Sequence, residues 1–552
     1  MRRLFRFFRM GALLLVLGVV AAGGVYGYLK YAPSGEWVDQ KAWYGTDGET
    51  ALFWNNELLE SSCGRFSDGQ AYLPLTWVSD SLNEKFYWDE TGHQLIYTLP
   101  ESIVYVDGST MGVDGRPLLI EADGGVWLSS GLVEAYTNVR IEAFEDGEVS
   151  RIYVDDIWGI EQTAQLKWKG KIRIRGGFKS AILTEAEKGE SVVILEELES
   201  WSRVRTADGY VGYIHNWLLG EMQEHTRISS FIEPEYTHRS METPVCMVWH
   251  QVTTAEANAG MEKLMANTDG VNVIAPTWFM LTDNEGSYVS FADQEYVDRA
   301  HEMGLQVWAV LDNFNQGGEV QSEVLFASTD ARRRLIAGLM EDVERYGIDG
   351  LNLDIESIRP EAGPHYVQFI RELSVNCRRN GIYLSVDTYV PSAYTAFYNR
   401  AEQGRVADYV VIMGYDEHYA GSEAGSVASL GYERQGIEDT LREVPCDQMI
   451  SAIPFYTRVW KGDGIETTSS ALGIVAAKNW VEKNEVELAW QEDLGQYYGE
   501  KTIDGVFCRI WMEEETSIGL KVDLIREYDL AGVACWKLGF EPADIWEIVK
   551  LP

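Results

Sequence analysis

The fold is decided by residues 348–357, which read IDGLNLDIES. In an extended strand successive side chains point to opposite faces, so Asn352, Asp354 and Glu356 share one face while the leucines and isoleucine between them share the other. The apolar face can pack under helices, and the polar face then points into the interior of a closed sheet. Like charges crowded in such an interior raise a carboxyl pKa, which is what a general acid needs at neutral pH.

Seven other apolar runs of strand character accompany this one between residues 241 and 552. In chain order the eight runs are Val245–Val252, Val271–Leu281, Gln306–Phe314, Ile348–Ser357, Ile382–Val390, Asp408–Tyr419, Met449–Trp460 and Gly532–Gly539. Most are separated by stretches of helical periodicity, such as residues 329–346. Eight strands alternating with helices predict a (β/α)8 TIM barrel over residues 241–552, with an insertion at about 461–512 after the seventh strand.

Charge and composition limit the partners of the chain. Its 86 acidic residues exceed its 46 basic ones, and a net charge of −40 would repel nucleic acid and anionic lipid, so a neutral substrate fits better. The 19 Trp and 29 Tyr residues suit sugar recognition, although most are expected to fill cores. The six cysteines form no CxxC pair, so we expect no metal and no cofactor. Cys246 and Cys535, on the first and last strands, could be neighbours or buried free thiols.

The amino terminus has the pattern of a membrane anchor. A basic segment, residues 1–9 with Arg2, Arg3, Arg6 and Arg9, precedes an uncharged run over residues 10–29. That length suits a spanning helix, with the basic side in the cytoplasm and everything beyond residue 29 outside it. The alternative is a cleaved signal peptide, because Ala21-Ala22-Gly23 offers small residues for cleavage.

Two β-rich modules are predicted between the anchor and the barrel. Residues 37–155 contain a possible repeat in which DGQAYL at residue 68 returns as DGGVWL at residue 123. This region resembles the stalk domain named after the copper amine oxidase amino terminus, for which a spacer role is expected. Residues 171–220 resemble a bacterial SH3-type barrel, with turns at Lys188-Gly189 and Asp208-Gly209. The resemblance implies either contact with the cell wall or a plain packing module.

The octet DGLNLDIE, residues 349–356, resembles the DGxDxDxE signature of family 18 glycoside hydrolases, the chitinase-like family. The resemblance implies that Glu356 protonates the leaving oxygen and that Asp354 orients the N-acetyl group of the substrate, whose oxygen acts as the nucleophile. Asn352 and Asp349 are expected to contact the substrate. Asn352 stands where most chitinases have Asp, and an amide cannot accept the proton that a carboxylate would share with Asp354, so we expect a pH profile that differs from theirs.

Three further segments match the same family in order. Residues 411–418, VIMGYDEH, resemble its sixth strand, which implies that Tyr415 binds the N-acetyl oxygen and Asp416 a ring hydroxyl. Residues 532–539, GVACWKLG, resemble its eighth strand, with Trp536 as the floor beneath the cleaved sugar. IPFYTRVW at residue 453 and RIWMEE at residue 509 resemble a branch of spore-cortex and cell-wall N-acetylglucosaminidases, and add Tyr456 and Trp511 as substrate contacts.

For several aromatic and polar residues a structural role has to be weighed against a functional one. His418 is expected to be a structural hydrogen-bonding residue, and Trp308 a core residue. Trp278 could be core or a sugar platform. Asp312 and Asn313, at the end of the third strand, could line the site or cap a helix, with the cap preferred.

The sequence therefore predicts a membrane-tethered, extracytoplasmic β-N-acetylglucosaminidase acting on peptidoglycan. Chitin is the alternative substrate. A wall-binding protein that holds glycan without cutting it is the alternative of a different class, and the presence of Glu356 weighs against it.

Overall fold

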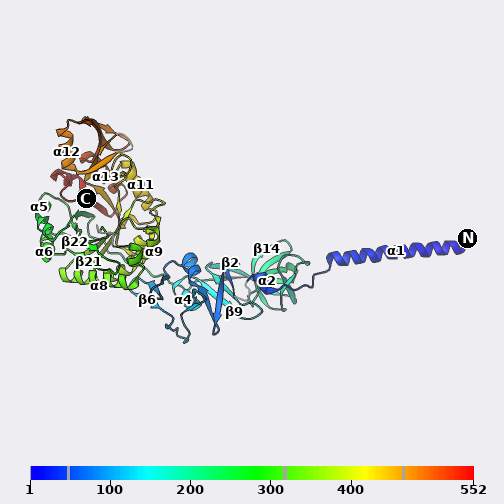
Figure 1. Ribbon diagram of the computed structural model, residues 1–552. Coiled ribbons are helices and arrows are strands. Elements are labelled where there is room, and N and C mark those ends of the chain that lie inside the picture. Colours follow the sequence, from blue (N-terminus) through cyan, green and yellow to red (C-terminus); the bar gives the residue numbers. More distant parts are fainter. Residues whose placement is uncertain (1, 46–49, 315–319, 463–466, 552) are drawn as a thin grey trace. The chain divides into compact units, whose positions relative to one another are not determined.

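The computed structural model describes residues 2–45, 50–314, 320–462 and 467–551. The chain divides into two compact units. The first joins Met1–Tyr87 to Val106–Glu233, and the second joins Trp88–Tyr105 to Pro234–Pro552 (Figure 1).

The core of the second unit is a closed barrel of eight parallel strands. They are β18 (Val245–His250), β19 (Val273–Pro276), β22 (Gln306–Asp312), β23 (Gly350–Asp354), β24 (Tyr383–Tyr389), β25 (Tyr409–Met413), β26 (Met449–Pro454) and β32 (Gly532–Trp536). Strand β32 pairs with β18 and with β26, and β19 pairs with both β18 and β22, so the ring closes. Each strand lies within one of the eight predicted runs, which confirms the TIM barrel.

Helices surround the barrel (Figure 1). They include α5 (Met261–Met265), α6 (Gln294–Glu302), α8 (Thr329–Tyr346), α9 (Gly363–Asn380), α10 (Arg400–Val406), α11 (Leu430–Thr440) and α13 (Glu515–Glu527). Helix α8 has the predicted bounds because a capping residue stands at each of its ends. The Ser328 side chain accepts a hydrogen bond from the amide of Ala331, and Gly347 ends the helix in the left-handed conformation, at φ 70°.

Two apolar layers separate the inside of the barrel from the outside. Leu351, Leu353 and Ile355 of the fourth-strand segment are buried between barrel and helices, as the alternation predicts. Inside, Trp308 stacks on Tyr383 and Tyr409 at ring-centroid distances of 5.2 and 5.5 Å, which confirms its core role. Trp278 is fully buried in the outer layer, so it is core as well. Cys246 and Cys535 are buried free thiols on the neighbouring strands β18 and β32.

The predicted seventh strand, residues 449–460, is not one strand. The chain leaves the barrel at Phe455, and β27 (Tyr456–Lys461) joins a separate sheet with β28 (Thr468–Gly473), β29 (Leu488–Gln491), β30 (Gln496–Ile503) and β31 (Val506–Met512). Helix α12 (Ile474–Lys483) packs on one face of this insertion sheet. The insertion therefore starts at Tyr456, and residues 463–466 of it lie outside the described part.

The first unit contains two seven-stranded sheets. One is built from β1 (Thr50–Trp54), β2 (Glu57–Ser67), β3 (Gln70–Pro74), β7 (Leu119–Ala122), β8 (Gly125–Ser129), β9 (Arg140–Phe144) and β10 (Arg151–Asp155). The proposed repeat is visible in it, because Asp68-Gly69 and Asp123-Gly124 make equivalent hairpin turns with positive φ, and a helical segment follows β3 and β8 alike.

The second sheet covers the predicted SH3-type region. It contains β11 (Gly159–Leu166), β12 (Gly170–Arg173), β13 (Ile182–Ala186), β14 (Ser191–Glu197), β15 (Trp201–Arg205), β16 (Val211–His215) and β17 (Leu219–Arg227). Strands β11 and β17 pair along their length and extend the module beyond the predicted residues 171–220 at both ends.

One segment inside the predicted stalk range of residues 37–155 belongs to the barrel unit. Residues Trp88–Tyr105, which include β5 (Gln94–Thr98), hydrogen-bond with the helix α9. The side chain of Gln368 donates to the Thr98 hydroxyl at 3.2 Å, and Arg378 donates to the Pro100 carbonyl at 2.9 Å.

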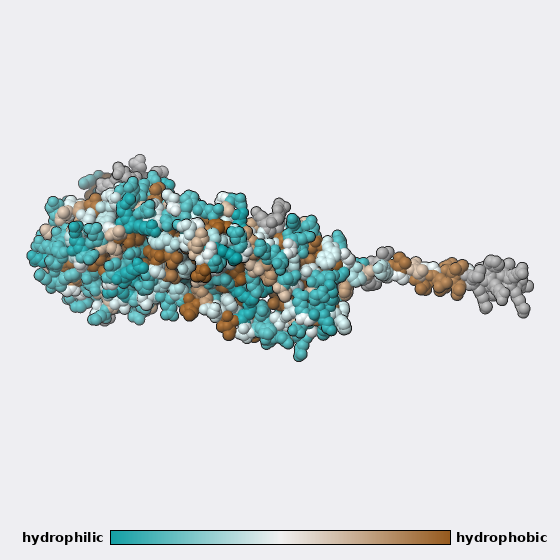
Figure 2. Space-filling model, turned by 90° about the horizontal axis from the view of Figure 1, so that it is seen from below, coloured by the Kyte–Doolittle hydropathy of each residue, from teal (hydrophilic) through white to brown (hydrophobic). Residues whose placement is uncertain are grey.

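The predicted anchor is a single helix, α1 (Arg2–Tyr31). Its described side chains from Leu13 to Val25 are largely apolar and exposed, and colour the helix brown in Figure 2. The side chains of residues 1–10, with the four arginines, lie outside the described part. Judged on described residues alone, no helix combines the length and apolarity needed to cross a bilayer. The anchor therefore stays a prediction.

Candidate active site

Four carboxyl groups meet at the carboxyl end of the barrel strands. Asp354 ends β23 and lies opposite Asp312 of β22, while Asp387 follows from β24 on the other side. Glu356 stands two residues beyond the end of β23. We call Asp312, Asp354, Glu356 and Asp387 the carboxyl cluster. Asp312, Asp354 and Asp387 are at most 7% exposed, so water solvates them poorly.

Asn352 lies beneath the cluster and fixes its geometry. Its carbonyl oxygen accepts a hydrogen bond from the indole of Trp249 at 2.9 Å. Its amide nitrogen donates to Asp387 Oδ1 at 2.7 Å and to Ser385 Oγ at 2.9 Å. Asn352 is fully buried and all its hydrogen bonds go to protein, so it positions neighbouring groups and does not contact substrate as predicted.

Glu356 is held by contacts to its side chain and its backbone. The Tyr389 hydroxyl donates to Glu356 Oε2 at 2.7 Å, and a further hydrogen bond joins Glu356 to Asp354. Asn313 donates to the Glu356 carbonyl at 2.8 Å and accepts from its amide at 3.0 Å. Asn313 therefore orients the acid. Asp312 accepts from the amide of Phe314 at 3.0 Å. The prediction that the pair caps a helix stays untested, because residues 315–319 lie outside the described part.

Burial and mutual repulsion raise the pKa values in the cluster. Burial raises the pKa of Asp354 well above its ordinary value, and the charges of Glu356, Asp387 and Asp312 raise it further. Burial is also the largest cause that raises the pKa of Glu356 and of Asp387. It raises the pKa of Asp312 to about 6. Within the described residues none of the four carboxyls forms an ion pair. The cluster therefore holds protons at a pH where an exposed carboxyl would have lost them.

Three predicted aromatic residues and Asp416 surround the cluster. Tyr456 donates to Asp416 Oδ1 at 2.6 Å, and its ring meets that of Tyr415 edge-on at 6.1 Å. The charges of Asp354 and Glu356 both raise the pKa of Tyr415 after burial, which places its hydroxyl near the cluster. Trp536 packs against Trp249 at 5.8 Å and stays partly exposed.

Three residues named from the sequence lie outside this arrangement. Asp349 precedes β23 at its amino end, where it accepts hydrogen bonds from His301 and from the amide of Val307 at 2.8 Å each, so its prediction as a substrate contact is corrected. Trp511 lies on the insertion sheet against Tyr498. His418 bonds the carbonyl of Ser426 through its ring nitrogen, in agreement with a structural role.

Asp387 and Tyr389 belong to the site but were not predicted from the sequence. Both lie in the predicted strand 382–390, which reads IYLSVDTYV, and Ser385, Asp387 and Tyr389 alternate along it as the polar residues of the fourth strand do. The same alternation rule applied to this strand would have placed them in the barrel interior.

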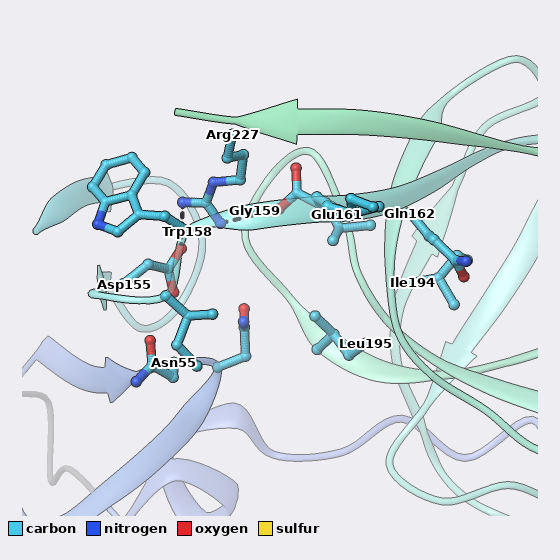
Figure 3. A pocket seen from close by; sticks show the side chains of 13 residues that line it. Asn55, Asp155, Trp158, Gly159, Glu161, Gln162, Ile194, Leu195 and Arg227 are labelled. Carbon is cyan, nitrogen blue, oxygen red and sulfur yellow. Dashed lines mark hydrogen bonds and ion pairs between the residues drawn. The ribbon is translucent and has the colours of Figure 1, made fainter. Parts of the chain in front are cut away.

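A second buried group of charged residues lies in the first unit, beside a pocket of about 390 Å³ (Figure 3). Asp155 Oδ2 accepts from Arg205 and from Arg227 at 3.1 Å each, and Arg227 also pairs with Glu161 at 3.1 Å. Ile157 and Trp158 add apolar lining. Here each buried carboxylate faces guanidinium groups.

Comparisons with known proteins agree with this geometry. The model of the family described as glycosyl hydrolases family 18 matches residues 280–541, and the bacterial SH3 domain model matches residues 169–220. A Bacillus subtilis protein called uncharacterized glycosylase YvbX is 27% identical over 51% of this chain and 84% of its own. The cortical fragment-lytic enzyme of B. subtilis is 28% identical over 41% of this chain, which spans only 55% of that relative.

Solved structures show the same fold. The Bacillus cereus spore cortex-lytic enzyme SleL has a TM-score of 0.51 and 20% identity, covering 59% of this chain and 77% of that one. A chitinase from Chromobacterium violaceum has a TM-score of 0.51 and 21% identity, covering 56% of this chain and 98% of that one.

Proposed function

We propose that this chain cleaves β-linked N-acetylglucosamine-containing glycan of the cell wall, with Glu356 as general acid and then general base. The match of residues 280–541 to the model of glycosyl hydrolases family 18 supports the proposal. Asp354 and Tyr415 are the other catalytic residues of the proposal. Asp416, Tyr456 and Trp536 bind the sugar at the cleaved bond.

The reaction proceeds in two steps in this proposal. In the first, the Glu356 carboxyl gives its proton to the glycosidic oxygen while the acetamido oxygen of the substrate attacks the anomeric carbon and the glycosidic bond breaks. Asp354 and Tyr415 hold the acetamido group in place. In the second, the Glu356 carboxylate takes a proton from the water that attacks the anomeric carbon, which restores the acetamido group and returns the acid with retained configuration.

One observation carries this proposal: Glu356 is hydrogen-bonded to a buried Asp354, in a cluster of carboxyls that has no cationic partner among the described residues. The two groups interact strongly, so they titrate as a pair. Because both pKa values are raised, the pair holds a proton at a pH where exposed carboxyls would have lost theirs. A barrel that only held glycan would gain nothing from four buried carboxyls, each of which costs free energy to bury.

Mass spectrometry of digestion products tests the activity and the substrate together. The full chain is incubated with purified peptidoglycan and with chitin oligomers, and new reducing ends are identified. Peptidoglycan fragments ending in reducing N-acetylglucosamine support the proposal. Products from chitin alone would make the enzyme a chitinase, and no products from either would favour a non-catalytic glycan-binding protein.

The names of the relatives favour a wall glycan. One relative is called a cortical fragment-lytic enzyme and another spore cortex-lytic enzyme, and the present chain adds a bacterial SH3 domain. We infer that this domain contacts the wall and holds the barrel near its substrate. Co-sedimentation of the full chain with insoluble peptidoglycan, with and without residues 169–220 replaced by a flexible linker, tests the inference; equal sedimentation would reject it.

The proposed location is the outer face of the cell membrane, with residues 10–29 as the anchor and residues 1–9 in the cytoplasm. The basic segment before an uncharged run of 20 residues supports this orientation. Extraction of membranes at alkaline pH tests it. The full chain should stay with the lipid, and release into the soluble fraction would reject the anchor.

A further inference from the structure

The insertion sheet has one face that does not contact α12. On the covered face, Val459, Ile510 and Met512 pack against the helix. Side chains alternate along a strand, so Tyr456 and Arg458 of β27 belong to the opposite face.

Two arginines come together on this opposite face. Val459 pairs with Ile510 and Trp460 pairs with Arg509, so Arg458 and Arg509 are diagonal neighbours on adjacent strands, with Trp511 on the same face. Arg458 donates to Ser469 Oγ at 3.2 Å through Nη1. The Nε atoms of both arginines are buried and lack a hydrogen-bond partner among the described residues.

Among the described residues neither arginine forms an ion pair, although Glu500 of β30 stands directly opposite Arg509 of β31. Over the described part of the chain, no Asp or Glu oxygen lies within 4.0 Å of Arg458 or Arg509. In a chain with 86 acidic and 46 basic residues this is unexpected: in the same unit Arg332 meets Glu372 at 2.9 Å and Arg371 meets Glu402 at 2.7 Å. The buried Arg400, which has no ion pair among the described residues, instead donates to the Tyr389 carbonyl and the Thr395 hydroxyl, so its N–H groups also find acceptors. A buried guanidinium N–H without an acceptor is costly. An anion that binds from outside would satisfy it.

The arginine pair is continuous with the active site. Tyr456, two residues before Arg458 on the same face, donates to Asp416 beside the carboxyl cluster. The charges of Arg458 and Glu356 both act on the pKa of Tyr456, the first lowering it and the second raising it, so both groups lie near Tyr456. Beyond the arginines, Tyr498 and Trp511 have ring centroids 4.9 Å apart, and their partly exposed rings can cover the apolar face of a sugar.

The geometry points to a subsite in which Arg458 and Arg509 bind a carboxylate carried by the glycan, so that the enzyme prefers an acidic N-acetylated glycan to a neutral one. A guanidinium binds a carboxylate through two parallel N–H bonds, and the free Nε atoms are the donors that this geometry uses. The inference rests on the proposed function and narrows it, because chitin carries no carboxylate. It departs from the expectation of a neutral substrate that the net charge suggested.

Binding to the Glu356→Gln variant tests the subsite without turnover. The ligands are soluble peptidoglycan fragments with their carboxylates free and the same fragments with the carboxylates amidated, and Kd is measured by calorimetry. Free fragments should bind about 10-fold or more tightly than amidated ones, as expected for a charge-assisted bidentate pair. A further pair of ligands, with and without the attached peptides, shows whether the carboxylate belongs to the sugar or to the peptide.

Arginine variants in the same background locate the effect. Arg458→Gln and Arg509→Gln should each weaken binding of the free fragments about 10-fold and leave binding of the amidated ones unchanged. Lys461→Gln is the matched control, because Lys461 is an exposed cation of the same strand on the opposite face. Arg458→Lys keeps the charge without the paired donors and should recover part of the loss, with thermal unfolding confirming that each variant folds.

Equal binding of free and amidated fragments, or arginine variants that weaken both alike, would overturn the subsite. Failure of the proposed function has a different signature. In that case the chain with Glu356 intact releases no reducing ends from any glycan, while the binding preference can still be measured.

Discussion

The two buried groups of acidic residues in this protein are stabilised in opposite ways. In the first unit, Asp155 accepts two guanidinium groups and each of these has a second carboxylate, Glu142 for Arg205 and Glu161 for Arg227. In the barrel, the carboxyl cluster has hydrogen bonds from Asn352 and Tyr389 and, among the described residues, no ion pair.

The difference separates a structural use of carboxylates from a chemical one. Ion pairing fixes a charge and stabilises a single geometry, so the group around Asp155 joins strands. Burial without a cation keeps protons bound and makes the group ready to give one away. Removing a carboxyl should therefore cost stability in the first unit and activity in the barrel.

The largest expected effect is that of Asp354→Asn on the rate. The substitution keeps the shape but removes the carboxylate that holds the acetamido group in the proposed mechanism, so kcat should fall about 100-fold or more while the temperature of unfolding stays close to that of the parent. Asp349→Asn is the matched control from the same octet, because Asp349 lies at the other end of the strand. Equal loss of activity in Asp354→Asn and Asp349→Asn would contradict a chemical role of the carboxyl cluster.

Asp155→Asn should show the reverse pattern. It leaves two buried guanidinium groups with one carboxylate each, and the loss of a buried pair costs about 3 kcal/mol. Calorimetric unfolding should show a less stable first unit, while the rate on soluble glycan stays within about twofold. Asp146→Asn, at an exposed aspartate of the same unit, should change neither. A large loss of activity with unchanged stability would contradict the structural role of Asp155.

The stability of the barrel should depend on pH through Asp312. Its pKa is raised from 3.8 to about 6 in the folded state, so the folded protein binds more protons than the unfolded one between these values and stability falls as pH rises through them. Asp312→Asn should therefore stabilise the barrel above pH 7 by up to about 3 kcal/mol and show no gain below pH 4. Urea unfolding at several pH values measures this, and a gain that is the same at every pH would argue against the raised pKa.

Tyr389→Phe should have the smallest effect. In the parent chain the hydrogen bond from Tyr389 lowers the pKa of Glu356. Without this bond the pKa of Glu356 rises, so the basic limb of the pH–rate profile moves to higher pH. We expect a rate decrease of about 10-fold at the optimum. Tyr394→Phe serves as control because Tyr394 is 89% exposed. A basic limb that moves to lower pH would show that Tyr389 does not stabilise the Glu356 carboxylate.

Local rules predicted what depends on local geometry. Period-two alternation in residues 348–357 placed Asn352, Asp354 and Glu356 inside the barrel, and helical periodicity predicted the helix over residues 329–346. The same alternation was not applied to the fifth strand, and Asp387 was missed for that reason. Asp349 was assigned to the site because it belongs to the motif, although it lies at the amino end of the strand, away from Glu356.

Other features depend on contacts between distant residues, which no local pattern contains. The chain leaves the barrel at Phe455 because Tyr456 to Lys461 pair with β28 and β31. Residues 88–105 read as part of a repeat, yet they join the barrel unit through Gln368 and Arg378. The arginine pair of the insertion sheet becomes visible only when the register of β27 and β31 is known.

The rate of Glu356→Gln tests the central claim most directly. Release of reducing ends from peptidoglycan is measured for the parent chain, for Glu356→Gln and for Glu361→Gln, which changes an exposed glutamate of the following turn. Loss of the general acid should lower kcat about 100-fold or more in Glu356→Gln alone, with unfolding unchanged. Cleavage by Glu356→Gln at the rate of the parent chain would contradict the account.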